Sequence, residues 1–210
     1  MSNKIIVVQK GCEIETQNIS GIKLEWLGNN AILKIHAPFN FSNCTFQIGN
    51  SDEIEIFENS DIRNLFIRCA SHDSVIKIGK KFSIVGGQFI LPNDHNKQLL
   101  TIGDNCLFSS SIFIQTSDGH SILDMNGTVL NNNGGSVKIG NHVWLDHGAS
   151  VLKKASIADN TIVAESAVVS KSFMQNNCIL GGVPAKIIKN GVNWSIKSPE
   201  IYQKENCKND

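Results

Sequence analysis

One histidine in this sequence has the surroundings of a catalytic base. His120 ends the run Ser117-Asp118-Gly119-His120, in a stretch rich in Asn, Gly and Ser that lacks apolar periodicity. Histidine can take a proton from a hydroxyl because its ordinary pKa lies near neutral pH. Asp118 could hold the imidazole in one tautomer, and a backbone carbonyl could do so equally well. We therefore predict a general base at His120, against the alternative of a solvated loop residue.

A tryptophan further along the chain is the second candidate. Trp144 lies between Val143 and Leu145. If these residues form a strand, the two aliphatic side chains point inward and the indole points outward. An outward-facing indole either packs against another subunit or forms the wall of a ligand site.

The elements that would position these side chains follow a six-residue repeat. From residue 137 the chain reads VKIGNH, VWLDHG, ASVLKK, ASIADN, TIVAES and AVVSKS. A helix turns 100° per residue, so an apolar stripe of period six would smear around its surface. Short strands joined by tight turns fit the repeat, because each strand points one aliphatic side chain inward. These aliphatic residues are Ile139, Leu145, Val151, Ile157, Val163 and Val169.

Three repeat units would close a triangular coil, and such coils stack through parallel hydrogen bonds into a β-helix. An Ile-Gly pair followed by a polar residue continues the pattern upstream, and we expect residues 20–114 to form less regular coils of the same solenoid. Two stretches interrupt it. Residues 92–97 form a small excursion, and 115–136 form a long loop that projects from a corner, where functional residues concentrate. The pairs begin at Ile48, Ile78, Ile102 and Ile139, and the first three are separated by whole multiples of the repeat.

Both ends of the solenoid need a cap, because a terminal coil would otherwise leave an open sheet edge. Residues 1–20 are expected to form a capping strand. The tail after Pro184, which includes Trp194, is expected to fold back over the other end as a short strand or helix. We place the β-helix domain at residues 1–190 and the C-terminal tail or cap at 191–210.

The composition excludes several classes of protein. The 19 basic and 19 acidic residues balance, so no net field attracts a nucleic acid or an anionic membrane. The apolar run near the N-terminus, residues 5–8, is too short for a signal peptide or a membrane span. We expect a cytoplasmic protein whose scattered cysteines are reduced and partly buried. The cysteines are Cys12, Cys44, Cys69, Cys106, Cys178 and Cys207.

Four features in this order resemble the hexapeptide-repeat acetyltransferases: the repeats, the loop 117–120, the run 139–145 and the segment Gly182-Val183-Pro184-Ala185-Lys186. The nearest similarity is to bacterial capsule and sialic-acid polysaccharide O-acetyltransferases, and it is strong over residues 100–190. The resemblance implies a left-handed parallel β-helix and a homotrimer with its active sites between subunits. It also implies acetyl-CoA as co-substrate, a carbohydrate acceptor and no metal.

The resemblance also assigns roles to residues. His120 would take the proton of a sugar hydroxyl, Asp118 would orient the imidazole, and the N–H of Trp144 would lie near the acetyl group and could help the oxyanion. Asp146 and Ala164 depart from the family, which usually has Gly at both positions, and the Asp146 side chain could narrow the cleft. The cofactor contacts carried over by position are His147, Ala164, Glu165, Ser170 and Lys171 for the pantetheine arm, and Lys186 and Lys189 for the phosphates.

Three alternatives stay open. An N-acetyltransferase acting on an amino-sugar would use the same fold and cofactor and would depend less on a base. His142, His147 and Gly148 resemble the H-x4-H-G motif of γ-class carbonic anhydrases, although Asn141 shifts the register and Cys106 stands where a third histidine would be expected. An inactive solenoid that serves as a scaffold is the third alternative.

Overall fold

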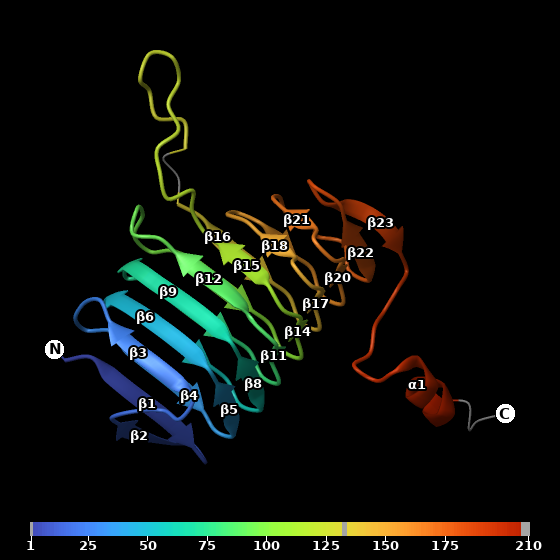
Figure 1. Ribbon diagram of the computed structural model, residues 1–210, viewed down its shortest axis with the longest axis horizontal. Coiled ribbons are helices and arrows are strands. Elements are labelled where there is room, and N and C mark those ends of the chain that lie inside the picture. The colour runs from blue at the N-terminus through green and yellow to red at the C-terminus, as the bar shows by residue number, and fades with distance from the viewer. Residues whose placement is uncertain (1, 132–133, 207–210) are drawn as a thin grey trace.

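The chain winds through three β-sheets and forms a β-solenoid of about seven turns (Figure 1). The computed structural model describes residues 2–131 and 134–206. From β4 to β21 the chain passes repeatedly through sheet A, then sheet C, then sheet B, and the strands of neighbouring coils pair in parallel. This architecture confirms the predicted β-helix.

The strands of each sheet follow one another at regular intervals along the chain. Sheet A contains β2 (Cys12–Thr16), β1 (Lys4–Gln9), β4 (Ile32–His36), β7 (Glu53–Ile56), β10 (Val75–Ile78), β13 (Leu99–Ile102), β16 (Ser136–Ile139) and β19 (Ser156–Ile157). Sheet C contains β5 (Phe39–Ser42), β8 (Ser60–Arg63), β11 (Ser83–Ile84), β14 (Leu107–Phe108), β17 (Trp144–Leu145), β20 (Ile162–Val163), β22 (Cys178–Gly181) and β23 (Lys186–Asn190). Sheet B contains β3 (Ile22–Trp26), β6 (Cys44–Asn50), β9 (Leu65–His72), β12 (Gly87–Leu91), β15 (Ile112–Gln115), β18 (Ser150–Val151) and β21 (Val168–Val169).

In the core, the inward-facing side chains of each sheet stack in one or two columns that run along the solenoid from coil to coil. The register of sheet A stacks six isoleucines that are at most 3% exposed, so the inward position predicted for the repeat is confirmed. Equivalent columns of side chains in sheets C and B fill the rest of the interior. Stacking of similar aliphatic side chains in neighbouring coils removes each of them from water. The isoleucine column consists of Ile35, Ile56, Ile78, Ile102, Ile139 and Ile157.

Coil length changes along the solenoid. Lys138 pairs with Ser156, three repeat units further along the chain, as the hexapeptide pattern predicts. Upstream, Ile32 pairs with Glu53 across a longer interval, and the coils that follow are longer still. The wider interior of these coils is filled by large side chains, because an interior at native density leaves no voids. The largest of them are Phe46, Phe82, Phe89 and Phe108, all fully buried.

The upstream Ile-Gly pairs are therefore not equivalent, and the interpretation of their spacing as multiples of six is wrong in part. Ile78, Ile102 and Ile139 occupy the same position in sheet A, whereas Ile48 lies in β6 of sheet B. The longer upstream coils carry inserted residues, so a count of six does not preserve the register there.

A ladder of side chains explains the Ile-Gly-polar motif at the corner between sheets A and C, here named the AC corner. Asn141 Oδ1 accepts the backbone N–H of Asp104 at 2.9 Å, and Asp104 Oδ1 accepts that of Lys80 at 2.8 Å. Each of these oxygens lies close to a glycine of the preceding coil. A Cβ added to Gly103, for example, would lie 2.6 Å from Asn141 Oδ1. Glycine is needed because the next coil's capping oxygen occupies the space of a side chain.

The same corner turns through one residue per coil with positive φ, a conformation that Asn adopts more readily than most residues. His142, with φ of 53°, occupies this position in its coil. The others are Asn59, Lys81, Asn105, Asn160 and Asn177.

Both ends of the solenoid are capped. The hairpin of β1 and β2 covers the first edge of sheet A, and β23 pairs antiparallel with β22 at the far edge of sheet C. The chain then runs back beside the solenoid to the short helix α1 (Pro199–Asn206) (Figure 1). Both caps were expected; residues 207–210 of the predicted tail lie outside the described part. No helix among the described residues could cross a membrane.

The cysteines of the described chain are unpaired, and all but Cys12 are buried. Burial raises the pKa of Cys106 to about 12, so this thiol stays protonated at neutral pH and packs as a small apolar side chain. The burial of four of these five thiols agrees with the prediction of partly buried cysteines. Cys207 lies outside the described residues.

Gly103→Ala should destabilise the solenoid, because the new Cβ would collide with Asn141 and push two coils apart. We expect the free energy of unfolding to fall by about 1–3 kcal/mol, the usual cost of overpacking. Gly86→Ala is the matched control, since its nearest neighbour would be the Asn64 side chain at 3.3 Å. Chemical denaturation of both variants measures the difference, and equal stability would argue against the ladder.

Candidate active site

The loop expected over 115–136 forms a finger that leaves the corner between sheets B and A, here named the BA corner (Figure 1). It spans residues 116–135, of which 132–133 lie outside the described part. Its arms pair as in a hairpin: Leu130 N–H donates to Ile122 O at 2.7 Å, and Leu123 and Val129 form an antiparallel bridge. At the tip, Asp124 Oδ1 accepts two backbone N–H groups.

The excursion at residues 92–97 supports the base of this finger. It occupies the same corner one coil earlier, between β12 and β13. The buried amide of Gln98 donates to His95 O at 2.7 Å and accepts the hydroxyl of Thr116, the first finger residue. Asp94 Oδ2 accepts the Ser117 hydroxyl and, at 3.0 Å, the N–H of Gly119. Two coils therefore hold the residues directly before His120.

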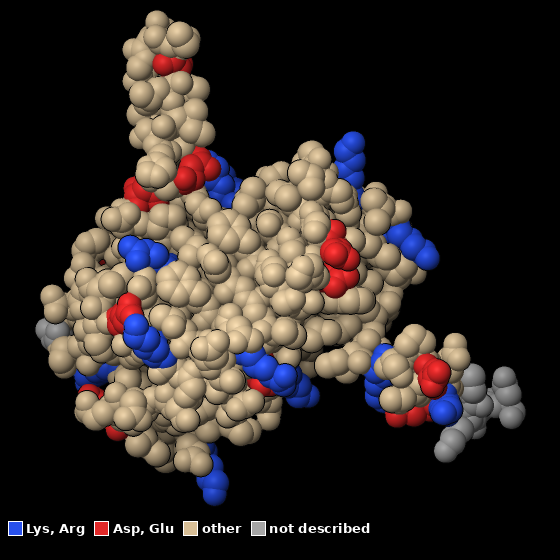
Figure 2. Space-filling model, in the orientation of Figure 1, with Lys and Arg blue, Asp and Glu red and all other residues tan. Residues whose placement is uncertain are grey.

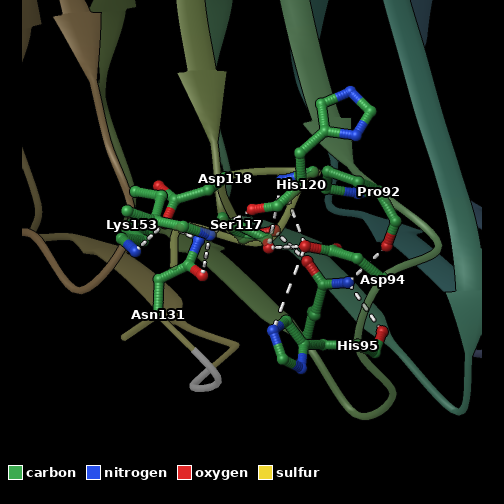
Figure 3. Close-up of polar contacts among 12 residues, drawn as sticks. Pro92, Asp94, His95, Ser117, Asp118, His120, Asn131 and Lys153 are labelled. Atoms are coloured by element: carbon green, nitrogen blue, oxygen red, sulfur yellow. Dashed lines mark hydrogen bonds and ion pairs between the residues drawn. The ribbon is translucent and has the colours of Figure 1, made fainter. Parts of the chain in front are cut away.

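Asp118 is bound by donors other than the imidazole. Its Oδ2 accepts Lys153 Nζ, from the next coil, and Asn131 Nδ2 at 2.6 Å (Figure 3). The Lys153 ammonium and then the Asn131 amide hold the pKa of Asp118 below its ordinary value. The carboxylate therefore ties the finger to the solenoid, and charged side chains of both signs gather there (Figure 2).

His120 is exposed, and its imidazole points away from the polar cluster at the base of the finger (Figure 3). Its backbone is held instead, because His120 O accepts Asn131 Nδ2 at 2.8 Å. Within the described residues no hydrogen bond occupies either ring nitrogen. An imidazole presented in this way can accept a proton from a molecule that arrives from outside the chain.

Trp144 points outward from sheet C between the buried Val143 and Leu145, as predicted. Trp194, from the C-terminal tail, lies beside it with ring centroids 6.0 Å apart. Trp194 also stacks on His142 at 4.2 Å and donates its Nε1–H to His142 O at 2.8 Å. In the described chain the indole N–H of Trp144 has no such acceptor.

A groove of about 570 Å³ opens beside the two indoles, between sheet C and the tail. Aromatic faces and an amide-rich, partly basic rim are features of sites that bind polar organic molecules. The lining residues are Trp144, Ile162, Asn193, Trp194, Ser195, Lys197, Pro199, Tyr202 and Gln203.

The residues predicted to hold the cofactor separate into two groups in the single chain. His147, Ala164 and Glu165 lie at the corner between sheets C and B, here named the CB corner, where His147 Nδ1 is 2.8 Å from Ser110 Oγ. Ser170 and Lys171 follow β21 at the BA corner, and Ser170 shares a hollow with Asp118 and Lys153. One chain therefore does not bring the whole set together.

Lys186 and Lys189 lie exposed on β23, at the far edge of sheet C. Asp146, which departs from the family pattern, turns its Oδ1 back to accept the N–H of His147 at 2.8 Å. This carboxylate caps the turn that carries His147.

The two histidines of the metal-enzyme alternative lie at different corners. His142 is at the AC corner, where its Nδ1 is 3.0 Å from Asn160 Oδ1, and His147 is at the CB corner. Among the described residues, no three metal-binding side chains gather in one place. This geometry gives the metal-enzyme alternative no support within one chain.

Apart from Asp118, sequence reasoning did not single out the residues that hold the finger. Asn131 lies in a run of three asparagines, and nothing distinguishes it in the sequence. Asp94 and Lys153 act across neighbouring coils, so only the coil register reveals them. The hairpin did have a signal: Asn126-Gly127 is a favoured turn dipeptide, and Gly127 has φ of +85°.

Comparisons with known proteins agree with this architecture. The bacterial transferase hexapeptide family (six repeats) matches residues 136–171. A polysialic acid O-acetyltransferase of Neisseria meningitidis is 30% identical over 187 residues, which cover 87% of this chain and 83% of that protein. The crystal structure of the polySia-specific acetyltransferase NeuO superposes with a TM-score of 0.80 at 24% identity, covering 94% of this chain and 87% of that one, and so supports the fold.

A second relative, a polysialic acid O-acetyltransferase of Escherichia coli O1:K1 / APEC, is 27% identical over 142 residues, 68% of this chain. The match covers 44% of that protein, so it spans less than half of the relative's length. The solenoid, the repeats and the similarity to the meningococcal protein over most of both chains lead to one assignment. The chain belongs to the hexapeptide-repeat acetyltransferases, in the family of the polysialic acid O-acetyltransferases.

Proposed function

We propose that this protein transfers an acetyl group from acetyl-CoA to a hydroxyl of an acidic, sialic-acid-type polysaccharide, with His120 as general base. The observation that carries the proposal is the accessible imidazole of His120 on the finger, in a chain of this family. The acceptor class is taken from the names of the relatives.

The reaction follows from the chemistry of the two groups. A His120 ring nitrogen takes the proton of the acceptor hydroxyl while the oxygen attacks the thioester carbonyl. The carbonyl oxygen becomes an oxyanion, which the indole N–H of Trp144 can stabilise by donating a hydrogen bond. When the C–S bond breaks, the imidazolium gives its proton to the sulfur of the leaving CoA. The net products are the acetyl ester and CoA.

The active site requires a second copy of the chain. His120 extends from the BA corner, which lies opposite sheet C in a three-sided coil, whereas Trp144 is on the outer face of sheet C. The solenoid therefore stands between them. A closed ring of three copies would set the finger of one against sheet C of the next and repeat the contact without an open end.

The finger has the surface expected of such a contact. Large apolar side chains project from it into solvent in the single chain, and contiguous apolar surface of this kind marks an interaction site. The aromatic groove beside Trp144 offers a complementary apolar surface. The exposed residues are Ile122, Leu123, Met125, Val129 and Leu130.

The division of the cofactor residues agrees with an active site between subunits. His147, Ala164 and Glu165 would come with sheet C of one copy, and Ser170 and Lys171 with the BA corner of its neighbour. Lys186 and Lys189 would meet the phosphates of acetyl-CoA at the end of the same face. Asp118 would support the finger rather than orient the imidazole.

His120→Ala should lower kcat by about 10²–10⁴-fold, the usual contribution of a general base, with little change in acetyl-CoA affinity. Acetyl transfer is measured as release of the CoA thiol, with polysialic acid, neutral capsule oligomers and amino-sugars as acceptors. His72→Ala, an exposed histidine elsewhere on the chain, is the control. Undiminished turnover would remove His120 from the mechanism, and transfer only to amines would favour the N-acetyltransferase alternative.

Mixing two inactive variants tests whether the site lies between subunits. Equal co-expression of His120→Ala and Trp144→Ala should regain up to about one quarter of the wild-type activity, because a quarter of the contacts would join an intact His120 to an intact Trp144. Each variant alone stays inactive. A mixture without gain would place both groups of the site within one chain.

Lys186→Glu should weaken acetyl-CoA binding because it replaces a cation near the phosphates with an anion. The loss of affinity should shrink as salt is added, since salt screens exposed charges. Titration calorimetry at two ionic strengths measures it, with Lys10→Glu, in the turn between β1 and β2, as the control. Equal affinity for both variants would place the phosphates elsewhere.

A further inference from the structure

One amide at the return arm of the finger binds both arms together. Asn131 Oδ1 accepts the N–H of Ile122 at 2.7 Å, and its Nδ2 donates to His120 O at 2.8 Å and to Asp118 Oδ2 at 2.6 Å. All three partners lie on the outgoing arm. The half-buried side chain thus uses its acceptor and both donors, which is the full capacity of an amide apart from one lone pair.

This amide lies in a chain of contacts that reaches the solenoid. Asp118, one of its partners, also accepts Lys153 Nζ from the next coil. Gly119, the residue after Asp118, donates its backbone N–H to Asp94 in the preceding coil. The backbone from Asp118 to Ile122 is therefore held at three points, and Asn131 provides the contacts nearest to His120.

Within the described part of the chain, the imidazole of His120 forms no hydrogen bond or ion pair that would fix its position. Its ring points away from Asp118 and Asn131 (Figure 3), and no hydrogen bond joins it to another described residue. The location of the base then depends on the backbone of His120, and the only side chain bonded to that backbone is Asn131, within the described residues.

We propose that Asn131 is a positioning residue that fixes the backbone of His120 and so places the general base; this rests on the proposed function. Asparagine suits this position because it supplies two donors and an acceptor from one short side chain. Aspartate keeps the acceptor for Ile122 but loses both donors and sets a second carboxylate against Asp118. Alanine removes all three contacts.

Asn131→Ala and Asn131→Asp should both lower kcat by about 10- to 100-fold, because a displacement of about 1 Å costs that much when a catalytic group must be aligned. The KM for acetyl-CoA and the melting temperature should stay near wild type, since the finger lies outside the core. Asn126→Ala is the matched control, an asparagine at the tip of the same finger whose side chain forms no hydrogen bond with a described residue. An Asn131→Ala kcat within twofold of wild type overturns the proposal.

Hydrogen exchange gives a readout that needs no substrate. Peptides covering residues 117–131 should exchange faster in Asn131→Ala than in Asn126→Ala, while peptides from the solenoid stay unchanged. Equal exchange of the finger in both variants would overturn the proposal, and faster exchange throughout the solenoid would show a general structural role instead.

A double-mutant cycle shows whether Asn131 acts through His120. In the His120→Ala background, Asn131→Ala should cost nothing further, because residues that act as a unit are not additive. An undiminished additional loss would show that Asn131 acts by another route. Unchanged turnover in His120→Ala alone would overturn the proposed function, whereas a normal loss there, with none in Asn131→Ala, would overturn only the role of Asn131.

Discussion

The stacking of one coil on the next, in strict register, is the constraint on which this molecule depends. Each coil offers its backbone to two neighbours, and a slip of one residue would turn every inward side chain outward. The AC corner strengthens the register through side-chain oxygens such as Asn141 Oδ1, which accept backbone N–H groups of the coil before and require glycine beneath them. The result is a rigid scaffold whose corners occupy fixed positions relative to one another.

The corners tolerate insertions because the ladder on either side of them is already determined. Leu99 pairs with Ser136 across an interval much longer than the one that separates Val75 from its own partner, Leu99. Lengthening a loop costs little extra closure entropy, so a finger can be added without loss of register. Its base then rests on two coils at once, through Asp94 below and Lys153 above. These contacts hold the backbone of the finger near His120 in a defined position relative to the solenoid.

The sequence predicted what depends on periodicity and left out what depends on contacts between coils. The inward positions Ile139, Leu145 and Val163 and the outward Trp144 follow from a six-residue count, and all are found as expected. The upstream coils were expected, but the count failed at Ile48, because the upstream coils carry inserted residues and are longer than three repeat units. The contacts of Asp94 and Lys153 depend on the register between coils, and those of Asn131 depend on how the two arms of the finger pair; no local pattern encodes either.

The electrostatics at the base of the finger favour the charged form of Asp118. Lys153 and Asn131 lower the pKa of Asp118, which makes it a weaker base and keeps it charged at neutral pH. A carboxylate that is paired with an ammonium would lose this ion pair if it took a proton, so the contact with Lys153 favours the charged form. The ring of His120 forms no hydrogen bond with another described residue, so the imidazole itself does not hold the finger. Of these two neighbouring side chains, only that of Asp118 holds the finger to the solenoid.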